Sequence, residues 1–134
     1  MSRLVIDTNS VLRCISRKSP FHDFWVSLFD GRNTWCVTNE ILDEYEEILQ
    51  SKTNKEFASL VLKAILNNPY TEFITNYYSF NLITADPDDN KFVDCCISAN
   101  ARFVVTDDKH FAVLNSIPFP KVEIISLEDV MKII

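Results

Sequence analysis

Short apolar runs alternate with amphipathic helical patterns along most of this 134-residue chain. Leu4-Val5-Ile6 is a brief apolar run that ends in an aspartate, whereas the segment after Thr38 repeats its apolar residues every three or four positions. The first pattern is typical of a buried strand and the second of a helix with one buried face. We expect strands at 3–7, 34–38, 102–106 and 122–126, and helices at 10–18, 21–30, 40–51, 55–67, 86–100 and 127–133.

This alternation predicts an α/β fold with a mostly parallel sheet that helices cover on both faces. The pattern is weakest over 70–84, where only 72–75 resembles a strand. A chain of 134 residues has the size of one domain, so we expect a single domain over 1–134.

Composition argues against several classes of protein. The net charge of −6 disfavours a broad basic face for duplex nucleic acid, although it allows a nuclease whose acidic site holds metal. No apolar stretch approaches the length of a membrane span, and Arg3 and Asp7 interrupt the only early apolar run, so we expect no signal peptide. The four cysteines form no CxxC pair, which favours free, mostly buried thiols in the cytoplasm.

Carboxylates follow two of the expected strands directly. Asp7 comes after the first strand, and Asp107 and Asp108 come after the strand at 102–106. Ligands of parallel α/β sheets bind beyond the carboxyl ends of the strands, so these acids are candidates for one site.

Helix phase selects two further acids. Asp89 precedes Phe92 and Val93 by three and four residues. Glu44 lies three residues after Ile41 and four before Ile48, on the apolar stripe of its helix. Both should therefore point inward, whereas Asp94 should face solvent because each helical residue turns by about 100°. A carboxylate on an apolar stripe is unfavourable unless it is paired, protonated or bound to metal.

Each acid also has a purely structural interpretation. Asp89 could stabilise a helix start, Glu44 could reach out to water, and Asp108 could serve a turn. Asp7 is the hardest to explain in this way, because Ser or Asn would serve equally well in its turn.

Two further features of the sequence argue against other catalytic mechanisms. It has no recognisable nucleophile–histidine arrangement, and its single glycine excludes a glycine-rich phosphate loop. Oxygen-rich sites suit Mg²⁺ or Mn²⁺, which can activate a water for attack on a phosphodiester.

Four stretches resemble the PIN-domain family, in the branch of VapC-related toxins of toxin–antitoxin pairs. They are LVIDTN, TNEILDEYEEIL, DPDDNKFVDCCISANARFVVTDDKHF and VEIISLEDVM, in the order that the family has them. The resemblance implies a three-layer α/β/α sandwich with a five-stranded sheet and a Mg²⁺- or Mn²⁺-dependent ribonuclease. It also implies a cytoplasmic protein with a small antitoxin partner and a homodimer.

The family's catalytic and metal-binding acids correspond to Asp7, Glu44, Asp89 and Asp108. The resemblance also implies supporting roles for Asn9, beside the first acid, and for Thr106, beside the last. The chain departs from the family at Asp107, where glycine or arginine is frequent.

Basic residues near the acids are candidates for holding the RNA substrate: Arg13, Lys91 and Lys109. Surface charge without a function is the simpler interpretation for any one of them. Two alternative functions stay open: a catalytically silent PIN-like module that binds protein, and a phosphotransfer or phosphatase α/β domain. The second fits less well, because Asn9 stands where the dehalogenase type has a second aspartate.

Overall fold

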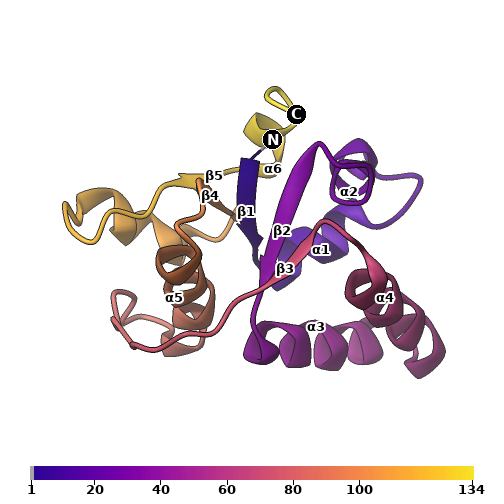
Figure 1. Cartoon of the computed structure of the whole chain (residues 1–134), viewed down its shortest axis with the longest axis horizontal. Helices are drawn as coiled ribbons and strands as arrows, with labels where there is room; N and C mark the ends of the chain where they lie inside the picture. Colours follow the sequence, from indigo (N-terminus) through magenta and orange to yellow (C-terminus); the bar gives the residue numbers. More distant parts are fainter. Residues whose placement is uncertain (1) are drawn as a thin grey trace.

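The sheet is parallel throughout in the computed structural model, which describes residues 2–134 (Figure 1). Its strands are β1 (Ser2–Ile6), β2 (Asn33–Val37), β3 (Thr71–Phe73), β4 (Phe103–Val105) and β5 (Ile124–Ile125). They lie in the order β3-β2-β1-β4-β5, and every neighbouring pair is parallel. Strand β1 thus lies at the centre of the sheet, and the direction of winding reverses between β1 and β4. Ligand sites of such sheets lie beside this reversal.

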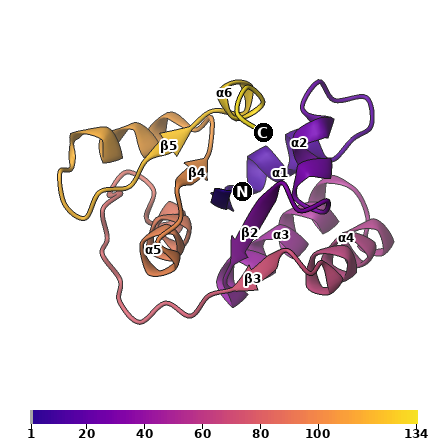
Figure 2. The ribbon, with the colours of Figure 1, turned by 45° about the horizontal axis from the view of Figure 1, so that its top comes forward.

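Helices cover both faces of the sheet, as the sequence predicts. In both views α5 lies on one side of β1 and β2, and α1 and α2 lie on the other (Figures 1 and 2). The α-helices are α1 (Thr8–Cys14), α2 (His22–Ser27), α3 (Asn39–Lys52), α4 (Lys55–Asn67), α5 (Asn90–Ala99) and α6 (Leu127–Val130). Two 3-10 segments, η1 (Pro87–Asp89) and η2 (Lys109–Ser116), precede α5 and follow β4.

Strand β2 shows how the two-residue period separates the two layers. Trp35 packs against Trp25 of α2 and Tyr45 of α3, with ring centroids 5.7 and 5.9 Å apart. The next residue, Cys36, is close enough to Cys95 of α5 to influence the pKa of that thiol. All four cysteines are buried and free, which confirms the prediction for the thiols.

Side-chain caps start the two long helices where the sequence predicts. The Thr38 hydroxyl accepts a hydrogen bond from the Ile41 amide at 3.2 Å, and the Asn54 side chain accepts one from the Phe57 amide at 2.8 Å. Such caps satisfy amides that have no partner within the helix. Within residues 2–134, no helix is long and apolar enough to cross a membrane.

The prediction that Asp94 faces solvent is wrong. Asp94 is only 7% exposed, and its carboxylate accepts a hydrogen bond from the Phe80 amide at 3.1 Å. The segment between β3 and η1 passes over this side of α5, and Asn90 holds it through both the amide and the carbonyl of Ile83. Helix phase gives a side chain's direction relative to the apolar stripe, but it does not reveal an irregular segment that covers the opposite side.

Candidate active site

Asp7 stands at the carboxyl edge of the sheet, where β1 lies beside β4. Ile6 is in register with Val105, so the residues that follow them, Asp7 and Thr106, are neighbours. The Asp7 carboxylate caps α1 by accepting a hydrogen bond from the Ser10 amide at 2.9 Å, and it accepts a second from the Thr106 hydroxyl. Burial raises the pKa of Asp7, and these hydrogen bonds oppose the rise. The first acid is therefore buried and fixed in orientation.

Asp108 faces the same edge, whereas Asp107 turns away. The Asp108 amide donates to the Thr106 hydroxyl at 3.0 Å, so one threonine contacts two of the acids. The Asp108 carboxylate is close enough to raise the pKa of both Asp7 and Asp89. Asp107 is half-exposed and forms an ion pair with Arg13.

Asp89 approaches this edge from the turn before α5. Its side chain is 16% exposed, and burial raises its pKa to about 7, with further contributions from Asp86, Asp108 and Asp7. One donor atom each from Asp86, Asp89 and His110 lie within 4.8 Å of one another. Acids that repel each other in a partly buried site are a common feature of functional sites.

Glu44 lies at the margin of this cluster and is already paired. Its carboxylate accepts hydrogen bonds from the Thr8 hydroxyl and from the Lys91 ammonium, whose nitrogen is 2.8 Å away. Thr8 directly follows Asp7 in the chain, so α3 is joined to the first acid through it. The structure thus brings Asp7, Asp89 and Asp108 together, with Glu44 beside them as a charge-neutralised pair.

A model of the PIN domain matches residues 3–110. The chain belongs to the PIN-domain family. No curated protein is significantly similar to it in sequence.

Solved structures share the fold of this PIN domain. The match to VapBC2 from Rickettsia felis, bound to a DNA fragment from their promoter, has a TM-score of 0.66 at 18% identity and covers 92% of this chain and 98% of that chain. VapBC-1 from nontypeable Haemophilus influenzae gives 0.64 at 12% identity over 94% and 98% of the two chains. The PIN domain endonuclease Utp24 gives 0.54 at 18% identity over 92% and 84%. At these identities the likeness establishes the fold alone.

The donor atoms in this PIN domain fit a divalent cation. Oδ2 of Asp89 and Nδ1 of His110 are both buried without a hydrogen-bond partner among the described residues, and they lie 3.9 Å apart. Unpartnered buried polar atoms are unfavourable, and a cation between them would satisfy both. Carboxylate oxygens suit Mg²⁺ and Mn²⁺, whereas an imidazole nitrogen suits transition ions better than Mg²⁺.

The residues expected to support the acids or hold substrate differ in their placement. Thr106 contacts both Asp7 and the Asp108 backbone, whereas Asn9 is exposed and lines a cavity of about 400 Å³ with Arg13 and Asp108. Lys109 is exposed, whereas the Lys91 side chain is only 14% exposed and bonded to Glu44. Of these three cations, Arg13 and Lys109 are exposed, and Arg13 is paired with Asp107.

Thr8 and Asp86 were not among the predicted site residues, and His110 was predicted only to flank the acids, not to lie within their cluster. Asp86 caps η1 by accepting a hydrogen bond from the Asp88 amide at 3.3 Å. The proximity of Asp86 to His110 depends on how η1 and η2 pack together. No pattern in the sequence predicts this packing. The one available signal is that His110 lies two residues after Asp108 in the same strand-end turn.

Proposed function

We propose that this PIN domain is a divalent-metal-dependent endoribonuclease that hydrolyses RNA phosphodiester bonds, and that it is the toxin of a toxin–antitoxin pair. The observation that carries the proposal is the meeting of Asp7, Asp89 and Asp108 at the carboxyl edge, where the pKa of Asp89 rises to about 7. Such mutual repulsion is unfavourable in the apo protein and is relieved when a cation binds.

The proposed metal ligands are Asp7, Glu44, Asp89 and Asp108, and we add His110 because its Nδ1 is buried and has no hydrogen-bond partner in the described part of the chain. A bound Mg²⁺ or Mn²⁺ would supply Lewis-acid activation of water and stabilise the charge that develops on the phosphate. The protein's own part is to fix the acids. Thr106 orients Asp7 and holds the Asp108 backbone, and the Lys91 ammonium neutralises Glu44.

Substrate and partners follow from the same proposal. Arg13 and Lys109, with Lys91 closer to the acids, would attract RNA phosphates toward an otherwise acidic edge. The solved VapBC structures with this fold support a small antitoxin partner, and the PIN domain endonuclease Utp24, which shares the fold, supports cleavage within the RNA chain. We also propose a homodimer, in the cytoplasm, where free thiols persist.

We further propose that residues 1–134 act as one nuclease domain. The matched region ends at residue 110, but β5 continues the same sheet, with Ile124 and Ile125 paired to Val104 and Val105. The C-terminal segment therefore completes the sheet of the matched region.

The deciding experiment is RNA cleavage by purified protein in Mg²⁺ or Mn²⁺, with EDTA and Asp7→Asn as controls. Metal-dependent cleavage that the substitution abolishes supports the nuclease. Cleavage that survives in the variant would contradict this placement of the site. Metal binding without cleavage of several RNAs would favour the catalytically silent module.

A further inference from the structure

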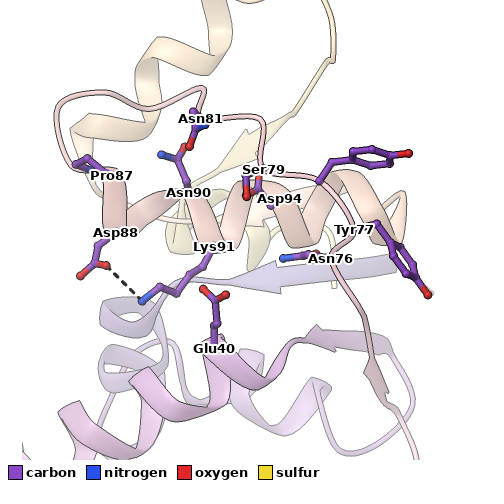
Figure 3. Close-up of a pocket in the computed structure, with 11 residues that line it drawn as sticks. Glu40, Asn76, Tyr77, Ser79, Asn81, Pro87, Asp88, Asn90, Lys91 and Asp94 are labelled. Atoms are coloured by element: carbon purple, nitrogen blue, oxygen red, sulfur yellow. Dashed lines mark ion pairs between the residues drawn. The ribbon is translucent and has the colours of Figure 1, made fainter.

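A polar pocket lies next to the acidic edge, on the far side of Lys91. It has a volume of about 270 Å³, and its walls come from α5, from Glu40 of α3 and from the segment that crosses α5 (Figure 3). The Lys91 nitrogen lies 2.8 Å from Glu44 and 3.9 Å from Asp88 of the pocket. One lysine thus borders both the candidate active site and the pocket, so a chain bound at the acids could extend into it.

Two carboxylates that line the pocket, those of Glu40 and Asp94, can accept hydrogen bonds from a ligand. One oxygen of Asp94 accepts from the Phe80 amide, and the same carboxylate lines the pocket opposite Glu40. Burial raises the pKa of Asp94, and the charge of Glu40 raises it further. A ligand that donates hydrogen bonds here would replace the lost hydration of these oxygens.

Aromatic side chains stand at one end of the same pocket. Tyr77 and Tyr78 line it although they are 82% and 74% exposed, and Tyr78 packs against Phe80 with ring centroids 6.3 Å apart. Figure 3 shows the Tyr77 ring at the end of the pocket away from Pro87. Exposed rings beside a polar pocket suit a planar ligand, because unstacked RNA bases stack on aromatic side chains while their edges are read by hydrogen bonds.

We propose that this pocket binds one unstacked base of the RNA substrate and prefers bases that carry an exocyclic amino group. The proposal rests on the ribonuclease function above and adds a base-reading subsite to it. Asp94 and Glu40 would accept from the amino group, as carboxylates do from cytosine N4. Uracil alone among the four RNA bases lacks that group, so it should bind most weakly.

The mixture of donors and acceptors favours a base over an arginine side chain from a protein partner. A guanidinium only donates hydrogen bonds, so it would use acceptors alone. The pocket also presents donors, namely the Lys91 ammonium, the Ser79 hydroxyl and the Asn76 and Asn81 amides. The Watson–Crick edge of a base carries both kinds of group.

The test is binding of AMP, CMP, GMP and UMP to the full chain in Mg²⁺, followed by NMR. These nucleotides contain no phosphodiester bond, so binding is measured independently of cleavage. We expect AMP, CMP and GMP to bind about tenfold more tightly than UMP, with the largest shifts at the Asn76 and Asn81 side-chain amides. Equal binding of all four, no binding of any, or shifts confined to other surfaces would overturn the proposal.

Two variants test separately the hydrogen bonds to the base and the stacking of the base on an aromatic ring. Asp94→Asn should bring the preference over UMP to within about twofold, because a neutral amide accepts more weakly. Tyr77→Ala should weaken all four nucleotides about tenfold, the usual size of a lost base–aromatic stack. Asp43→Asn and Phe119→Ala, an exposed acid and a ring 87% exposed away from the pocket, are the matched controls and should change neither value. Tyr77 is mostly exposed, so its variant keeps the test valid if Asp94→Asn fails to fold.

Further outcomes distinguish this proposal from the nuclease itself. If the protein prefers these nucleotides but does not cleave RNA, the base-binding subsite stands and the proposed ribonuclease function is wrong. A protein that cleaves RNA without any base preference at the nucleotide or oligonucleotide level would overturn the subsite alone. N-acetyl-arginine amide that binds in place of the nucleotides would overturn it in favour of a protein partner.

Discussion

The two sides of the acidic edge differ in how many of their polar groups have hydrogen-bond partners. On the held side, formed by Asp7, Thr106 and Asp108, each polar group has a protein partner, and the Thr106 hydroxyl contacts both acids. On the open side, formed by Asp86, Asp89 and His110, two buried atoms among the described residues have none. The held side can be stable without a ligand, whereas the open side is unfavourable until something binds.

This difference suggests that the two sides have different roles in binding a cation. The held side sits on strand ends and the first turn of α1, so its carboxylates are preorganised by the sheet. The open side sits on two 3-10 segments, where backbone position depends on local contacts. A site that fixes one ligand group and leaves another free can bind a cation without first breaking hydrogen bonds.

The largest effect should come from removing charge on the held side. Asp7→Asn should lower RNA cleavage by about 10³-fold, the scale seen when preorganised electrostatic stabilisation is lost. Its melting temperature should change little, because asparagine caps a helix as well as aspartate does. Asp43→Asn, at an exposed acid of α3 that has no part in the proposed site, is the matched control. Equal losses in the two variants would contradict the assignment of Asp7.

Metal binding should raise stability through the open side. At a concentration 100 times the dissociation constant, Mn²⁺ or Mg²⁺ adds about 2.7 kcal/mol. For a chain of this size that is a rise of about 10 °C in melting temperature. Asp89→Asn should remove most of the rise, whereas Asp88→Asn, at a side chain 83% exposed, should keep it. An unchanged wild-type melting temperature with both ions would argue against a metal site.

Thr106→Val should destabilise the apo protein by about 1–3 kcal/mol, the range for leaving buried polar groups without partners. Valine keeps the shape of threonine but removes the hydroxyl that donates to Asp7 and accepts from the Asp108 amide. Urea unfolding in EDTA measures the loss. Thr34→Val, on β2 at a half-buried position, is the control for the strand environment. A loss no larger than the control's would show that the shared hydroxyl does not hold the acids.

The comparison also explains which parts of the site could be predicted from sequence. Asp7 and the pair Asp107 and Asp108 follow short apolar runs, and adjacent parallel strands bring such ends together by topology alone. The choice of Asp108 over Asp107 rests on the resemblance to the family. Glu44 and Asp89 follow from helix phase. The pairing of Glu44 with Lys91, 47 residues later in the chain, depends on how α3 meets α5, and no local pattern encodes it.

The wrong or missing predictions concern residues in or beneath segments that show no helical or strand periodicity. His110 lies in η2, a 3-10 segment that the sequence does not predict. The prediction that Asp94 faces solvent fails because the irregular segment that covers it shows neither helical nor strand spacing. The same segment forms part of the pocket beside the site, so the region that was hardest to predict contributes to the proposed specificity.

The smallest effect should appear in the pH dependence of the apo protein. The pKa of Asp89 rises from 3.8 to about 7 on folding. The folded state therefore binds more protons than the unfolded state between these values, so this group's stabilising contribution is complete below about pH 4 and is lost as pH rises through 7. Asp89→Asn removes the titration, so in EDTA the variant should be more stable than the wild type at pH 8 and similar to it at pH 4. Partial exposure to solvent keeps the difference small. Thermal unfolding of both proteins from pH 4 to pH 8 measures this difference in stability. Parallel pH profiles would mean that folding does not shift the pKa of Asp89. The distinction between the held and the open side would then be wrong.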